Sequence, residues 1–327
     1  MKRLAALVLA LLVHLLTLAF LALGAWAVLA HLDSLIGWLL GDLSLAVGWA
    51  LRPRLARLPA DAEVLDRAAA GELYTLADRV ADRARVKRPR KVAVRDLATE
   101  TVYDHVGVLR TPVLVIGLPL WLALPPRQRV ALLATAYARK PAGEELVVDG
   151  ALFTLAAWHD ALLGSNVPLK VREEAQTTIA RSSLSALDHP GTTYEAMGIF
   201  GRLIARVLGG PVLLAEYALT GLARAGRPRT EERREAIARR VVSEAELTEL
   251  RDVAAGGYLA PIQAAALRGE SVTAIRQGAL ARHRLTADGV LTSAPHSELL
   301  GTAASALIDE ELLRHYTRAI RGFGLIT

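Results

Sequence analysis

Histidines are the side chains of this 327-residue sequence best suited to metal or acid–base chemistry, since the chain contains no cysteine. The lack of cysteine excludes a disulfide framework, Cys-ligated zinc, iron–sulfur clusters and a thiol nucleophile. No two of the eight histidines are four residues apart: His14, His31, His105, His159, His189, His283, His296 and His315. Because residues i and i+4 share one face of a helix, the commonest helical zinc motif is absent.

Other polar residues offer no complete catalytic group. His159 and Asp160 are adjacent near the end of an apolar segment, where a helix points them in different directions, so we interpret them as a helix-end polar patch. His296 lies in a turn region without an identifiable partner, and His14 is expected to hydrogen-bond a neighbouring helix. The loop that follows Pro141 is predicted to expose three acidic side chains to solvent: Glu144, Glu145 and Asp149.

Several function classes are excluded by composition and motifs. The net charge is +6, but only 5% of the residues are aromatic, and charges of both signs alternate between Arg227 and Asp252. That alternation is typical of a solvated helix face, so we predict no nucleic-acid partner. The sequence also lacks a P-loop, a serine elbow and a dinucleotide fingerprint.

The N-terminal region is strongly apolar. Residues 4–32 contain no Asp, Glu, Lys or Arg, and a helix of this length extends over roughly 43 Å, more than the roughly 30 Å of a bilayer core. A second apolar run, Leu35 to Leu51, is interrupted only by Asp42. We predict a transmembrane helical hairpin over residues 1–51. One span followed by an interfacial helix, or a cleaved signal peptide ending near Ala25-Trp26-Ala27, are the alternatives.

Flanking cations predict the orientation of this hairpin. The connecting turn carries only Asp33, whereas basic residues lie at both outer ends: Lys2, Arg3, Arg52, Arg54 and Arg57. Under the positive-inside rule both ends face the cytoplasm. We therefore expect a cell-membrane protein, with the lipid bilayer as a partner and residues 52–327 as a cytoplasmic domain.

The remaining chain is predicted to be α+β and mainly helical. Residues 62–85 are amphipathic at helical spacing, whereas 91–97 and 110–117 are strand candidates, the second one nearly all apolar and therefore central. Pro125-Pro126 opens a helix that is apolar on every side and so expected to be buried. Further helices are expected at 147–163, 173–187, 194–208, 211–225, 230–255 and 307–321.

A family resemblance lies around this buried helix. The stretch VLVIGLPLWLALPPRQRVALLATAYARKPAGEE resembles the core of the HtpX-type membrane metallopeptidases, which are gluzincins. In that family a strand ending in Gly-Leu-Pro precedes a buried helix reading His-Glu-x-x-His. The downstream segment LLAEYALTGLARAG resembles the part that bears the third zinc ligand, and weaker likeness covers most of the chain. The resemblance implies a zincin-like metallopeptidase core.

The residues of the zinc motif are replaced in this chain. The resemblance places Thr135 and Arg139 at the two histidines, Ala136 at the glutamate, and Glu216 at the third ligand. A catalytic zinc needs three protein ligands, yet threonine is a poor ligand and a guanidinium cannot be deprotonated to become one. Alanine offers no general base, a contribution of about 10²–10⁴-fold. We therefore expect neither a zinc site nor any other cofactor.

These substitutions favour a pseudoprotease. We expect a catalytically inactive, membrane-anchored metallopeptidase homologue that acts as a binding, scaffold or regulatory protein, with a protein or peptide partner added as a strand in the former substrate groove. We also hypothesise that Arg139 and Glu216 form an ion pair across the former metal site. The alternatives are an active HtpX-like endopeptidase with a displaced metal site, or a peptidase scaffold repurposed for other chemistry.

Overall fold

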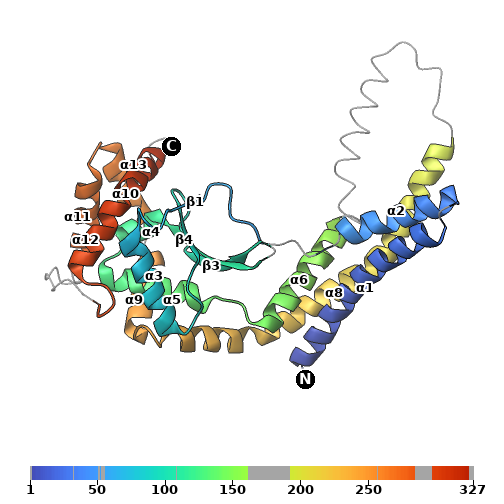
Figure 1. Cartoon of the computed structure of the whole chain (residues 1–327), viewed down its shortest axis with the longest axis horizontal. Coiled ribbons are helices and arrows are strands. Elements are labelled where there is room, and N and C mark those ends of the chain that lie inside the picture. The colour runs from blue at the N-terminus through green and yellow to red at the C-terminus, as the bar shows by residue number, and fades with distance from the viewer. Residues whose placement is uncertain are drawn as a thin grey trace, which may run out of the picture. The chain divides into compact units, whose positions relative to one another are not determined.

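The computed structural model describes residues 2–31, 33–50, 52, 56–107, 109–160, 192–255, 257–283 and 297–323. It is mainly helical and contains one four-stranded sheet (Figure 1). The chain forms two compact units. The first unit joins residues 1–54 to 141–228, and the second joins residues 55–140 to 229–327. An α+β, mainly helical fold agrees with the prediction from the sequence.

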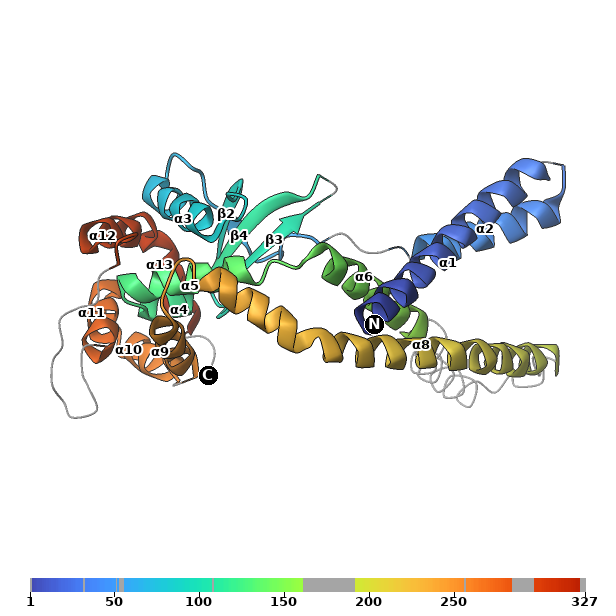
Figure 2. The same ribbon diagram turned by 90° about the horizontal axis from the view of Figure 1, so that it is seen from below.

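The first unit is an assembly of apolar helices. Its members are α1 (Lys2–Ala30), α2 (Leu35–Ala50), α6 (Gly143–His159) and the part of α8 (Thr192–Ala238) that ends at Pro228. By length and composition α1 can cross a membrane, whereas α2 is a shorter apolar helix. The two helices fold back on each other as an antiparallel hairpin, as the views in Figures 1 and 2 show.

Small residues lie at the contact between α1 and α2. A Cβ atom on Gly24 would be 2.8 Å from the carbonyl oxygen of Gly41, and one on Gly41 would be 3.0 Å from the backbone nitrogen of Val28. The Ser44 hydroxyl donates to the Phe20 carbonyl oxygen across the same contact, at 2.8 Å. Close backbone approach at small residues, with an interhelical hydrogen bond, is how helices pack where hydrophobic burial cannot hold them together.

The second unit is built on the sheet, whose strand order is β1-β2-β4-β3. β4 pairs in parallel with β2 and antiparallel with β3, so the apolar strand predicted to be central has a neighbour on each side. One sheet face packs with helices in the main core, and the other covers Leu58 and Ala62. The strands are β1 (Glu63–Val64), β2 (Lys91–Arg95), β3 (Val102–Val106) and β4 (Thr111–Gly117).

Helix α5 (Pro126–Ala138) crosses this core, and nearly all of its side chains are buried, as its sequence predicted. α3 and α9 pack against it, and α4 leads into it from β4. The other helices of this unit are α3 (Gly71–Ala84), α4 (Leu118–Ala123), α9 (Glu244–Ala255), α10 (Leu259–Leu267), α11 (Val272–His283), α12 (Thr302–Glu311) and α13 (Leu313–Phe323).

A buried ionic network ties α5 to the C-terminal helices. Arg129, fully buried in α5, donates to Oδ1 of Asp309 at 2.5 Å, and Arg276 donates to Oδ2 at 3.2 Å. The Tyr316 hydroxyl donates to Oδ1 at 2.9 Å. Arg276 also donates to two backbone carbonyls at the end of α4. Helices α5, α11, α12 and α13 therefore meet at a single carboxylate.

Several predicted element boundaries were wrong. The helix predicted over residues 62–85 begins only at Gly71, because Glu63–Val64 pairs with β2 as a strand. The predicted helices 194–208 and 211–225 are one continuous helix, α8, which contains Pro211 and Pro228. The predicted helix 230–255 is interrupted between α8 and α9, and 307–321 is divided between α12 and α13. The predicted helix 173–187 lies outside the described residues.

Candidate functional site

The C-terminal end of α5 forms one wall of a cavity of about 530 Å³ in the second unit. Thr135, Ala136 and Arg139 all line it, so the structure brings together the three positions at which the sequence resembles a zinc motif. Ala136 is buried, Thr135 is half-buried, and Arg139 is exposed at the C-cap of the helix. Spacing of i and i+4 on α5 accounts for the shared wall.

The cavity has an apolar floor and a charged rim. The floor comes from α4, α5, α8 and α9: Leu120, Leu132, Ala136, Ala138, Ala238, Leu247, Leu250 and Ala254. The charged lining residues are Glu100, Arg139, Glu231, Arg234, Glu235 and Arg251. More than half of the lining residues are polar, so the cavity suits a ligand that carries charged groups beside an apolar part.

Most of the rim charges pair with one another. Arg234 donates to Glu231 at 2.9 Å, and Glu235 lies 3.6 Å from Arg251. Within the described residues, Arg139 makes no ion pair with any carboxylate. Its guanidinium is therefore an exposed, uncompensated cation at the cavity.

The cavity extends to the start of β3, because its lining includes Thr99, Glu100 and Thr101. Pro112 of β4 lies opposite His105 of β3. The carbonyl oxygen of Pro112 points to the β2 side of β4, where it accepts a hydrogen bond from the backbone N–H of Arg90. In an antiparallel pair, opposite residues either both point their backbone N–H and C=O groups toward each other or both point them away. His105 therefore points these groups away from β4, and so does Tyr103, two residues earlier. No described strand pairs with that outer edge of β3.

Side chains stabilise this edge from the inside. The Tyr103 hydroxyl donates to the Lys87 carbonyl at 2.7 Å, its ring packs on Tyr137 with centroids 4.9 Å apart, and burial raises the pKa of Tyr103 to about 12. At the outer edge, the Asp104 carboxylate accepts the backbone N–H of His105 at 2.6 Å. A capped N–H is one way to protect an exposed edge from indiscriminate pairing.

These side chains do not fit a catalytic zinc ion. The Thr135 hydroxyl donates to the Ala131 carbonyl at 2.9 Å, and the neighbouring lining positions carry a methyl group and a guanidinium. Among the residues that the structure describes, no group of three or more His, Cys, Asp or Glu side chains could hold a metal ion.

Glu216, the fourth motif position, is not among the residues that line the cavity. It belongs to the first unit, where its carboxylate lies 3.1 Å from Nδ1 of His159 at the end of α6. Because Arg139 belongs to the second unit, the Arg139–Glu216 ion pair stays a prediction. The acids that share the cavity with Thr135 and Arg139 are Glu231 and Glu235, which the sequence suggested only as part of an alternating charge run.

The other candidates have structural roles. His14 lies 3.1 Å from the Val147 carbonyl oxygen on α6, so the expected hydrogen bond to a neighbouring helix is confirmed, with Nε2–H as the donor. The acidic residues predicted in a loop instead belong to α6, which begins at Gly143. Acidic side chains in a first turn favour helix formation through the helix dipole. His296 lies outside the described residues.

Comparisons with known proteins give no relative for this chain: no family model, no curated protein and no solved structure matches it.

Proposed function

We propose that this protein is a membrane-anchored, catalytically inactive metallopeptidase homologue that binds an extended polypeptide segment. In this proposal, the zincin-like core lies in the second unit, and the polypeptide adds to β3 next to the cavity. The observation that carries the proposal is that a cavity lined by Thr135, Ala136 and Arg139, which cannot together hold zinc, extends to the start of β3. The outer edge of β3 pairs with no strand among the described residues.

The apolar surface of the first unit supports membrane anchoring. Large side chains point outward on α1 and α2 while small ones are buried, the reverse of a helix in water: Leu15 is 63% exposed and Leu35 86%, but Ala10 is fully buried. At the end of α2, the Arg52 guanidinium lies over the Trp49 ring, 3.4 Å from its centroid. Tryptophan and arginine together are typical of the headgroup region.

Polypeptide binding is tested with a labelled extended peptide. The probe is N-terminally fluorescein-labelled Val-Thr-Val-Thr-Val-Thr-Lys-Leu, titrated with the full-length protein in detergent micelles and followed by fluorescence anisotropy. We expect saturable binding without cleavage, and no zinc in the purified protein by elemental analysis. Absence of binding would refute the proposal, and chelator-sensitive cleavage of the peptide would establish the active-endopeptidase alternative instead.

A proline at the edge of β3 tests where the peptide binds. His105 directs its N–H away from β4, where the Asp104 carboxylate accepts it, so an added strand pairs there only by displacing that carboxylate. His105→Pro keeps the β3–β4 ladder and puts a ring on the outer edge. His105→Ala removes the same side chain and keeps the N–H. We expect the proline variant to bind the peptide at least about tenfold more weakly (~1.4 kcal/mol) and the alanine variant to bind as the wild type does. Equal loss in both variants would place the peptide elsewhere.

Restoring the motif tests the inherited framework. A triple variant, Thr135→His, Ala136→Glu and Arg139→His, supplies two imidazoles on one face of α5. Since Glu231 lines the same cavity, we expect it to complete the zinc site. Adding Glu231→Gln should then abolish zinc binding, whereas adding Glu216→Gln should not. The opposite pattern would favour the assignment of Glu216 that the resemblance implies.

A further inference from the structure

The uncompensated cation at the cavity suggests what kind of polypeptide end fits there; this inference rests on the proposed function. Arg139 is exposed, and no described carboxylate pairs with it, although four other rim charges form ion pairs within the rim. Glutamates 231 and 235 are already engaged by arginines of α8 and α9. A guanidinium in this position presents several N–H donors to a planar anion, for which a carboxylate is the best match.

The floor of the cavity selects an apolar group next to that anion. Leucine and alanine side chains from four helices form the floor, and Leu132, Leu247 and Leu250 are among the buried ones. Burying one leucine-sized side chain there strengthens binding by roughly 10- to 150-fold. A ligand that places a carboxylate at Arg139 and an aliphatic side chain on the floor therefore satisfies both surfaces.

Strand direction decides which end of a polypeptide reaches the cavity. β3 runs away from the cavity, since Thr99, Glu100 and Thr101 line it and the strand then continues from Val102 to Val106. A parallel segment would bring its N-terminal amine next to Arg139, where like charges repel. We therefore take the added segment to be antiparallel to β3, as β4 is on the other side, so that it runs the opposite way. Its C-terminal end therefore arrives at the cavity, where Arg139 is exposed.

Glu100 adds a preference for the residue before the terminus. Its side chain is exposed at the segment that leads into β3, and it makes no ion pair within the described residues. Because neighbouring side chains of an extended segment alternate sides, the penultimate residue points away from the floor. A cation at that place is favoured by Glu100, and a second acid is disfavoured.

We propose that the cavity binds the free C-terminus of a partner polypeptide, with the terminal carboxylate on Arg139, an apolar terminal side chain on the floor and a basic penultimate residue near Glu100. Recognition then depends on a chain end rather than on an internal segment. The site takes intact or newly generated C-termini and does not cut them.

Two forms of one peptide test this proposal with the full-length protein in micelles. The labelled octapeptide used above is compared as the free acid and as the C-terminal amide. We expect the acid to bind about tenfold more tightly, which is the ratio for a charge-assisted contact of about 1.4 kcal/mol. Changing the penultimate lysine to glutamate should weaken binding of the acid severalfold.

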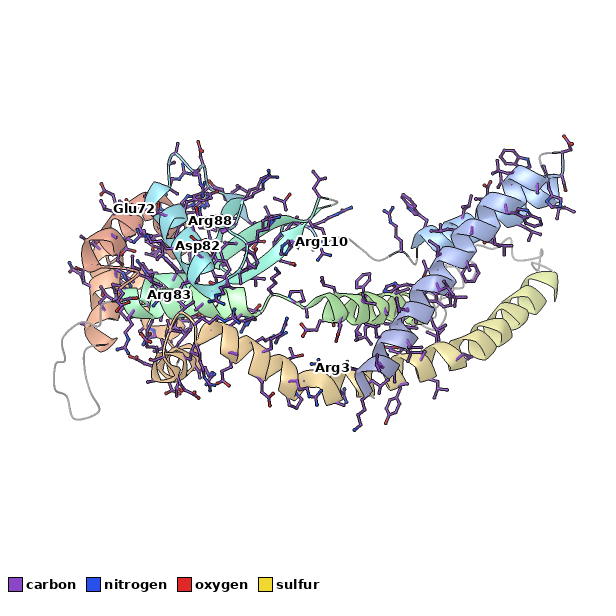
Figure 3. All side chains as sticks on the ribbon, turned by 60° about the horizontal axis from the view of Figure 1, so that its bottom comes forward. Arg3, Glu72, Asp82, Arg83, Arg88 and Arg110 are labelled. Atoms are coloured by element: carbon purple, nitrogen blue, oxygen red, sulfur yellow. The ribbon has the colours of Figure 1, made fainter. Side chains whose placement is uncertain are left out.

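Variants assign the effect to Arg139. In Arg139→Gln the acid and the amide should bind equally, while Arg139→Lys should keep part of the preference. Arg83→Gln serves as the matched control, because Arg83 (Figure 3) is an exposed arginine of α3 outside the cavity. Equal binding of acid and amide by the wild type, or a preference that survives Arg139→Gln, overturns the C-terminal site and leaves peptide binding established. If neither form binds, the proposed function fails as well.

Discussion

At the residue scale, the network around Asp309 shows how a buried charge is held in the second unit. Burial raises the pKa of Asp309, but the charges of Arg129 and Arg276 and the hydrogen bonds from Arg129 and Tyr316 outweigh it, so the pKa lies below its usual value. Burial and the charge of Arg129 together lower the pKa of Arg276 to about 10. Two guanidiniums share one carboxylate, so loss of that carboxylate leaves buried positive charge without compensation.

We therefore expect Asp309→Asn to lower the free energy of unfolding by roughly 3–5 kcal/mol. Asp82→Asn is the matched control, since Asp82 and Arg88 form an exposed pair at 2.7 Å (both labelled in Figure 3) and such pairs contribute about 0–1 kcal/mol. Thermal or urea unfolding of both variants measures the difference. Similar small losses would mean that the Asp309 network contributes no more than a surface pair.

A pH dependence follows from His315. Burial lowers its pKa, with Arg314 and Arg318 acting in the same direction and Glu63 and Asp96 opposing them. Because the folded protein holds the neutral imidazole, this contribution to stability is complete above the unfolded pKa of about 6.5 and is lost as the pH falls through the lower folded value. We expect unfolding experiments to show stability falling below about pH 6.5, and His315→Gln to flatten that slope. An unchanged slope would assign it to other groups.

At the element scale, helix contacts in the first unit depend on glycine. Gly41 has no room for a side chain, since a Cβ there would be 2.5 Å from Cγ2 of Val28 and 3.1 Å from the Gly24 carbonyl oxygen. Gly221, in α8, has no atom near its Cβ position. The two glycines belong to helices of the same unit but differ in their surroundings.

We expect Gly41→Ala to destabilise the hairpin by about 1–3 kcal/mol, because an added methyl group forces α1 and α2 apart. Gly221→Ala should instead be neutral or stabilising by about 0.5–1 kcal/mol, since alanine favours a helix. Thermal unfolding in micelles, followed by circular dichroism, compares the two variants. Equal effects would show that intrinsic helix propensity, and not close contact, determines them.

At the scale of the whole molecule, the proposed membrane orientation is open to direct measurement. The natural chain has no cysteine, so a single introduced cysteine reports without background. We expect Asp33→Cys, in the turn between α1 and α2, to react with a membrane-impermeant maleimide in intact cells. Arg83→Cys, in the second unit, should react only after the membrane is opened. If Arg83→Cys reacts in intact cells and Asp33→Cys only after lysis, the orientation is the opposite of the proposed one. If neither or both react before lysis, the hairpin does not span the membrane.

Local patterns in the sequence were sufficient for several elements. The apolar run before residue 32 determined α1, the apolar strand ending at Gly117 determined β4, and Pro125-Pro126 determined the start of α5. These predictions succeeded because length, periodicity and proline act over a few residues. Strand β3 was missed, since Val-Tyr-Asp-His-Val carries polar side chains in an edge strand, where one side of the strand remains unpaired.

The sequence by itself determined that α1 is long and apolar enough for a membrane and that the positions at 135, 136 and 139 cannot together bind zinc, because both follow from side-chain chemistry and i, i+4 spacing. Only the tertiary structure decided which residues share the cavity with them. Glu231 and Glu235 line it and Glu216 does not, although all three are on one helix. Such contacts join residues about a hundred positions apart, and they depend on packing that no local pattern encodes.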